Sequence, residues 1–250
     1  MGGGPGLNFG QIPTSAGYPY PVPDLSEFIL VLPVLVFSIV AHEYAHGAAA
    51  YAQGDDTAYM LGRLTFNPIP HIDPWMSILF PALLWFGSAH LGSPFTFGAA
   101  KPVPVNPRKY RNYRKGDIIV SSAGVVINLG LSVVFTILFA LVGLLGRAAP
   151  PLQPGLMILQ QMTAYGVLLN LVLCFFNLIP IPPLDGSHLF YYVLPPELGA
   201  RYRSLQRFGF LLLFALLFLL PGVLNVFLIP AHWIGSRLLG LVAPYSLSFL

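Results

Sequence analysis

The chain has 250 residues, of which 56% are hydrophobic and 8% are charged, and its formal net charge is +3. Soluble domains carry about 25% charged residues, so this composition excludes a soluble globular protein and indicates a multi-pass membrane protein. The small charge and the absence of basic–aromatic interleaving exclude a nucleic-acid surface. The single cysteine, Cys174, excludes a disulfide within the chain.

The N-terminal residues 1–23 are rich in Gly and Pro and contain no Lys or Arg. We expect a flexible tail here rather than a secretory signal peptide, which would begin with a basic region. Residues 24–250 are expected to form one membrane-embedded domain, because no polar stretch is long enough for a separate soluble one. The first apolar segment covers residues 25–51.

Further apolar segments follow at residues 75–97, 117–146, 156–179, 208–229 and 231–249, and Pro221-Gly222 interrupts the segment at 208–229. Since about 20 residues span the hydrocarbon layer, we expect an all-α polytopic membrane protein with about five to six transmembrane segments. Breaks at Pro81, Gly87 and Gly92 predict a re-entrant or broken element at residues 75–97, and a simple span is the alternative.

Residues 98–105 carry alternating prolines, which predict a short extended, β-like element. Pro102 and Pro104 remove donors from one edge only, so the N–H groups of Lys101, Val103 and Val105 could pair with an extended substrate. The alternative is a loop whose prolines discourage aggregation.

Basic residues cluster in two loops. Residues 101–115 hold six of the twelve Lys and Arg residues, and residues 201–207 hold three more. The positive-inside rule places both loops in the cytoplasm, and the two apolar segments between them give the same parity.

The first apolar segment contains His42-Glu43-x-x-His46. Residues four apart lie on one helix face, so both imidazoles can bind one metal ion, and Glu43 lies about 100° around the helix. This is the zinc-hydrolase pattern, in which two histidines hold Zn²⁺ and a carboxylate takes a proton from water. Helix packing by hydrogen-bonded histidines is the alternative, but packing needs no Glu at this spacing.

A catalytic zinc takes a third protein ligand and keeps one position open. Asp185 is the best candidate, because it follows the irregular Pro180-Ile181-Pro182-Pro183-Leu184 stretch and precedes Gly186, which permits a tight turn. Non-helical backbone at membrane depth lines protein or a watery cavity. His71 and Asp73 remain plausible loop ligands, and Asp185 as a turn residue is the alternative.

The two motifs, His42-Glu43-x-x-His46 and Asn177-x-x-Pro180-x-Pro182-x-Leu184-Asp185-Gly186, resemble the site-2 protease family of intramembrane zinc metalloproteases. The resemblance covers about residues 25–190, and the loops at residues 62–74 and 101–107 resemble a compact prokaryotic branch without a PDZ domain. It implies one Zn²⁺ per chain held by His42, His46 and Asp185, with Glu43 as general base and Asn177 assisting the oxyanion.

The resemblance also implies substrates that span the membrane once, a prokaryotic plasma membrane, and an active site toward the cytoplasm. The family often has Gly-Pro and a following Asn after its central loop. Here Gly124-Val125-Val126-Ile127-Asn128 lacks the proline, so a role for Asn128 stays open. His188, three residues past Asp185, is either a hydrogen-bonding partner of a ligand or a loop histidine without a role.

Two other functions fit the same residues. A metal-ion transporter would use the His/Asp cluster for its cargo, but the segments at 117–146 and 208–229 offer little polar lining. A non-catalytic membrane scaffold would have no need for Glu43.

Overall fold

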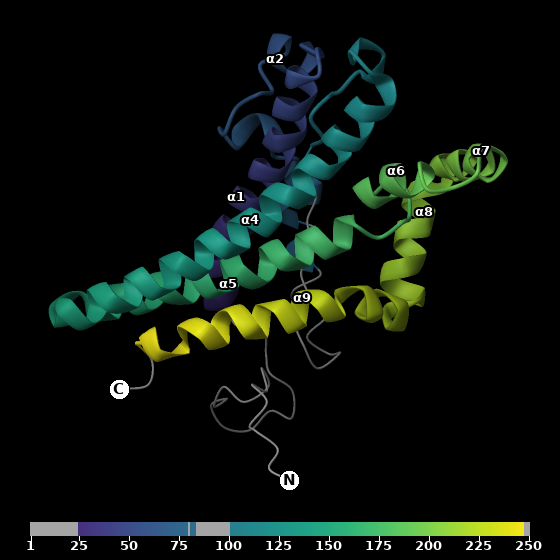
Figure 1. Ribbon diagram of the computed structural model, residues 1–250. Coiled ribbons are helices and arrows are strands. Elements are labelled where there is room, and N and C mark those ends of the chain that lie inside the picture. Colours follow the sequence, from purple (N-terminus) through teal and green to yellow (C-terminus); the bar gives the residue numbers. More distant parts are fainter. Residues whose placement is uncertain (1–24, 80, 84–100, 248–250) are drawn as a thin grey trace.

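The computed structural model describes residues 25–79, 81–83 and 101–247, and these residues form helices without a strand (Figure 1). The elements are α1 Leu25–Ala52, α2 Thr57–Met60, η1 Ile69–His71, η2 Pro74–Leu79, η4 Pro107–Lys109, α4 Tyr113–Ala148, η5 Pro150–Leu152, α5 Gln153–Asn177, α6 Asp185–Tyr191, α7 Pro196–Ser204, η6 Leu205–Phe208, α8 Gly209–Phe214, η7 Ala215–Leu219, α9 Pro221–Val242 and η8 Ala243–Tyr245. The all-α prediction is confirmed.

Four helical stretches of the described residues are long and apolar enough to cross a membrane: Leu25–Ala52, Tyr113–Ala148, Pro150–Asn177 and Gly222–Tyr245. A fifth crossing is counted if Pro196–Phe208 and Leu211–Leu219, which meet at 80°, form one bent span. The protein is therefore a polytopic membrane protein. The tail at residues 1–23 and most of the 75–97 segment, including its predicted re-entrant part, lie outside the described residues.

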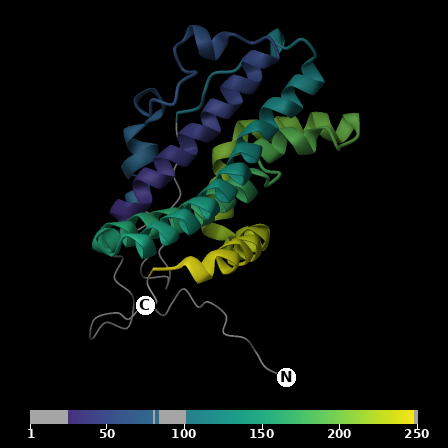
Figure 2. The same cartoon turned by 60° about the vertical axis from the view of Figure 1, so that its left-hand side comes forward.

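The helix α4 is the longest element and the centre of the packing. Its 36 residues begin at Asn112, whose side chain accepts a hydrogen bond from the Lys115 N–H. At a rise of 1.5 Å per residue, α4 is about 54 Å long, well beyond one bilayer crossing. It packs against α5 over its C-terminal part, and it also contacts α1, α6 and α9 (Figures 1 and 2).

The C-terminal apolar residues form a different pair of helices from the one expected. We predicted segments at 208–229 and 231–249, but the break falls at Leu220 and α9 runs from Pro221 to Val242. Proline has no N–H and disfavours helical backbone in the preceding residue, so a helix ends most readily just before Pro221. The second proline, Pro230, lies inside α9, as membrane helices tolerate.

The residues just after α9 are held against the α4–α5 hairpin by the buried side-chain amide of Gln160. Gln160 on α5 donates to the carbonyls of Phe139 and Tyr245, at 3.1 and 3.0 Å, and accepts from the Leu247 N–H at 2.9 Å. This side chain therefore satisfies groups from three segments in an apolar setting, where unsatisfied polar groups are costly.

Residues 101–106, which we call the strap, have no regular secondary structure and lie along α1. The Lys101 N–H donates to the His71 carbonyl at 2.8 Å, and the Val103 N–H donates to Glu43 Oε2 at 2.7 Å. The free strand edge expected at these two residues is therefore wrong for this structure, because their donors are already satisfied within the chain. The Asn106 N–H donates to the buried Asp55 carboxylate at 2.5 Å, which fixes the far end of the strap.

Candidate metal centre

Helix α1 brings His42 and His46 together one turn apart, as the spacing predicts. Their Nε2 atoms lie 3.0 Å apart. His42 is buried, with 7% of its surface exposed, although it lies in the middle of an apolar helix. Ionisable side chains within an apolar helix of this kind are energetically costly, so their convergence indicates a functional site.

Asp185 is the first residue of α6 and reaches the same point from 139 residues further along the chain than His46. Its Oδ2 lies 3.2 Å from His42 Nε2 and 3.2 Å from His46 Nε2. Asp185, the third candidate ligand predicted from the sequence, therefore lies against His42 and His46.

An apolar anchor holds the loop that leads to Asp185. Residues on α5, in this loop, on η7 and on α9 form one buried cluster: Phe176, Ile179, Leu184, Leu216, Leu224 and Leu228. Gly186 is required for close approach rather than for a turn, since a methyl group there would overlap the Leu178 carbonyl and lie 2.8 Å from the Ile179 oxygen. This close packing of Gly186 against the loop backbone holds the first turn of α6 next to His42 and His46.

The three converging atoms fit a zinc ion. With Zn–N and Zn–O bonds of about 2.0–2.1 Å, tetrahedral ligands lie about 3.3 Å from one another, close to the three distances of 3.0–3.2 Å in this centre. Among the described residues, His42, His46 and Asp185 form the one group of three potential ligands within 4.8 Å. Burial acts against ionisation of Asp185, but the two histidine side chains beside its carboxyl outweigh burial and hold its pKa below the usual range.

Helix α4 supports both histidines from the opposite side. The Nδ1–H of His46 donates to the Val120 carbonyl at 2.7 Å, which leaves Nε2 free to ligate. One turn further on, a methyl group at Gly124 would lie 2.5 Å from Nε2 and 2.6 Å from Nδ1 of His42. Only glycine therefore leaves room for the His42 ring against α4.

A polar tie joins α4 to α6 beside the centre. The Tyr192 hydroxyl donates to Asp117 Oδ2 at 2.8 Å, and His188 Nδ1 lies 3.5 Å from Asp117 Oδ1. Burial and the neighbouring Asp117 carboxylate raise the pKa of Tyr192, so its hydroxyl remains a donor. His188 thus pairs with Asp117 rather than with a ligand, and this tie fixes the orientation of the helix that carries Asp185.

Glu43 is held by the strap. Its Oε2 accepts the Val103 N–H at 2.7 Å, and Val103 is 6% exposed. One turn along α1, a methyl group at Gly47 would lie 3.1 Å from Val103 Cγ1, so the strap and α1 are in close contact here. A single hydrogen bond therefore fixes the Glu43 carboxylate on the α1 face next to the histidines.

The other candidates lie elsewhere. His71 is fully buried and its Nε2 lies 3.0 Å from the Thr65 carbonyl, while Asp73 begins the turn into η2; neither belongs to the three-residue group. Asn177 ends α5, and its Nδ2 donates to the Leu173 carbonyl at 2.9 Å. Asn128 is fully buried in α4.

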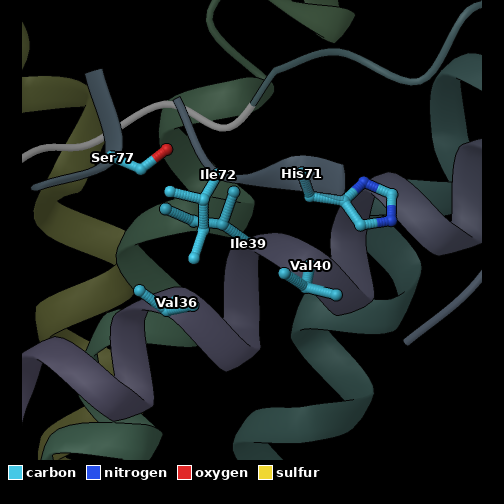
Figure 3. A pocket seen from close by; sticks show the side chains of 6 residues that line it. All are labelled: Val36, Ile39, Val40, His71, Ile72 and Ser77. Carbon is cyan, nitrogen blue, oxygen red and sulfur yellow. The ribbon is translucent and has the colours of Figure 1, made fainter. Parts of the chain in front are cut away.

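A small apolar recess lies on α1, lined by Val36, Ile39, Val40, His71, Ile72 and Ser77 (Figure 3). Val36 and Val40 precede Glu43 by seven and three residues, so at 100° per residue they lie within about 60° of it on the helix. The recess therefore continues the α1 face that carries Glu43, toward the start of the helix.

Comparisons with known proteins agree with this centre. The family model described as Peptidase family M50 matches residues 154–220. YwhC of Bacillus subtilis, named as a predicted zinc metalloprotease, is 38% identical over 203 residues, which cover 81% of this chain and 84% of YwhC. The chain belongs to the site-2 protease family, peptidase family M50. Rip2 of Mycolicibacterium smegmatis, named in the same way, is 29% identical over 213 residues, 85% of this chain and 75% of Rip2. No solved structure gave a significant match.

Membership of the site-2 protease family makes this chain a multi-pass membrane zinc metalloprotease. Zinc is its cofactor, and the His42–His46–Asp185 group could bind a single ion. Sequence reasoning missed the supporting residues on α4. Asp117, Val120 and Gly124 recur every three or four residues, and that spacing on one helix face was the available signal.

Proposed function

We propose that the protease cleaves a peptide bond within or near a transmembrane segment of a membrane-protein substrate. The observation that carries this proposal is the convergence of His42, His46 and Asp185 beside apolar helices long enough to span a bilayer. A hydrolytic site at membrane depth gives access to bonds that a soluble protease does not reach.

His42, His46 and Asp185 are the proposed zinc ligands. Their converging atoms support the assignment, and three ligands leave one position for water or substrate. When bound, zinc lowers the pKa of a water molecule to about 7 and polarises the scissile carbonyl.

Glu43 is the proposed general base. It follows His42 directly and its carboxylate is anchored to the Val103 N–H, which restrains the side chain without using its second oxygen. In this role Glu43 accepts a proton from the attacking water and delivers it to the leaving amine. Because Glu43 is not a proposed ligand, its replacement should separate catalysis from metal binding.

Asn177 is proposed to assist the oxyanion. It lies at the end of α5, eight residues before Asp185. Its Nδ2 donates to Leu173 within its own helix, so the amide would turn from that carbonyl toward substrate. Its contribution should therefore appear in kcat rather than in zinc content.

Single-span membrane proteins are the proposed substrates. Peptide bonds in a helix are shielded by their own hydrogen bonds, so the cleaved segment must be extended locally. The α1 face that carries Glu43, which the small recess at Val36, Ile39 and Val40 continues, is the proposed contact surface for such a segment. Because the strap uses the Lys101 and Val103 donors internally, substrate pairing there would require their release.

We further propose that the protease lies in a prokaryotic plasma membrane with its metal centre toward the cytoplasm. The six Lys and Arg residues between 101 and 115, which flank the start of α4, support this orientation through the positive-inside rule. In that arrangement His46 lies nearer the cytoplasmic end of α1 than His42 does.

The test is cleavage of a purified single-span substrate in detergent or lipid by the wild type and by Glu43→Gln. We expect the wild type to cut within or beside the apolar segment, and Glu43→Gln to keep its zinc but lose at least about 100-fold in rate. A fully active Glu43→Gln protein would contradict the assignment. A metal-ion transporter would move zinc into vesicles without cutting, but the relatives do not favour that alternative.

A further inference from the structure

Several buried polar side-chain atoms lack hydrogen-bond partners among the described residues, including Asp185 Oδ2, Ser187 Oγ and Asn170 Oδ1. His42 Nδ1 and both polar atoms of the Asn128 amide form no hydrogen bond with any residue that the structure describes. Asn128 has no exposed surface and lies in the middle of α4. An amide buried in an apolar environment without partners costs a few kcal/mol, so this arrangement calls for a partner in the working protein.

The register between α1 and α4 places these groups near each other. His46 contacts Val120, and His42 contacts Gly124, so the two helices are antiparallel and advance by one turn together. Continuing by one more turn brings Asn128 to the level of Ser38. Asn128 therefore lies on the same α4 face as the contacts to both histidines, one turn deeper.

The side chains of Asn128 and His42 lean toward each other. Side chains on a helix lean toward its N-terminus and cover the preceding turn. Asn128 therefore leans toward Gly124, which has no side chain of its own and against which the His42 ring is packed. The His42 side chain leans along α1 toward Ser38, which is toward the level of Asn128.

We propose that Asn128 is the positioning residue for His42: its amide oxygen accepts the Nδ1–H of His42, after a side-chain rotation or through one water molecule. Metal-bound histidines almost always donate their second ring N–H, which fixes the tautomer and the ring plane. Val120 performs this task for His46 with a backbone carbonyl, and Asn128 performs it for His42. The inference rests on the proposed zinc ligands.

The test measures zinc affinity of the full-length protein in detergent, by competition with a coloured chelator. Asn128→Leu removes the acceptor at nearly constant volume, and we expect zinc affinity to fall about 10-fold to 100-fold. Asn128→Asp keeps an oxygen at this position and should restore affinity to within about threefold. The visible spectrum of the cobalt-substituted protein should change in Asn128→Leu and match wild type in Asn128→Asp.

Thr136→Val is the matched control, because Thr136 is also buried in α4 but donates within its own helix to the Ser132 carbonyl. It should leave zinc affinity and the cobalt spectrum unchanged. If Asn128→Leu does not fold, Asn128→Asp still decides: a loss of 10-fold or more would overturn the inference. Wild-type affinity and spectrum in Asn128→Leu would do the same. A wild type that binds no zinc would instead refute the proposed function.

Discussion

The two histidines of the metal centre are supported in unequal ways. On the His46 side, hydrogen bonds position the side chain: Nδ1 donates to Val120, and the neighbouring α6 is tied to Asp117 by Tyr192. On the His42 side, the ring is confined by the shape of α4 at Gly124, and its Nδ1 has no acceptor among the described residues. His46 is thus positioned mainly by hydrogen bonds, and His42 is positioned mainly by steric packing against α4.

This difference follows from depth in the helix bundle. His46 lies one turn closer to the end of α1, and the Val120 carbonyl inside α4 accepts its Nδ1–H through a second lone pair. His42 lies one turn further inside the bundle and faces Gly124 of the same helix, and no described carbonyl accepts its Nδ1–H. The orientation of His42 therefore depends on the absence of a side chain at Gly124 and on a buried amide such as that of Asn128. Substitution of either residue should strongly lower zinc affinity.

The largest effect is expected from filling the gap beside His42. Gly124→Ala places a methyl group within 2.6 Å of His42 Nδ1, so the ring must leave its position. We expect zinc affinity to fall more than about 100-fold, because a displaced imidazole loses most of a ligand bond. Gly130→Ala is the control on the same helix, since nothing lies within 4 Å of a methyl group there. Unchanged zinc affinity in Gly124→Ala would show that space does not fix His42.

A second, smaller effect should distinguish loss of the general base from loss of the metal, because kcat should fall while zinc content stays the same. Val103→Pro removes the N–H that holds Glu43 and leaves all three proposed ligands intact. We expect kcat on a single-span substrate to fall about 10-fold to 100-fold at unchanged zinc content, because the base is no longer positioned. Val105→Pro, two residues along the strap, should have little effect. Loss of zinc in Val103→Pro would mean that the strap supports the metal as well.

The smallest effect is expected on the His46 side, where several bonds share the task. Tyr192→Phe removes the hydroxyl that donates to Asp117 and loosens α6 by one charge-assisted hydrogen bond. Because the anchored loop before α6 remains, we expect only a threefold to tenfold loss of zinc affinity, corresponding to about 1 kcal/mol. The adjacent Tyr191→Phe is the control. A loss above 100-fold would reverse the order of the two sides.

The sequence predicted which three side chains come together, because buried ionisable residues and runs of proline are unusual in a membrane segment. His42 and His46 are ionisable groups within an apolar helix, and Asp185 follows a run of prolines that no ordinary span would contain. The long helices were predicted for the same reason, since continuous apolar segments have few alternatives in a membrane.

The supporting contacts could not be predicted, because they depend on how helices register against one another. Nothing in the sequence says that a Val120 carbonyl is free to accept, or that Gly124 meets a ring 82 residues earlier. The prediction for the strap was wrong for a related reason. The prolines at 102 and 104 show which residues keep a backbone N–H, but tertiary contacts with His71 and Glu43 determine whether the N–H groups of Lys101 and Val103 remain unpaired. The break at Leu220 was visible as Pro221, yet its effect on the two flanking segments was misplaced.

The central claim is that two imidazoles and one carboxylate hold a single zinc ion in the membrane-embedded protein. X-ray absorption at the zinc edge, with zinc content measured on the same purified sample, tests it most directly. We predict one zinc per chain with two histidine nitrogens and an oxygen ligand in the wild type, and zinc loss in Asp185→Ala. Sulfur in the coordination shell, or a full zinc content in Asp185→Ala, would contradict this account.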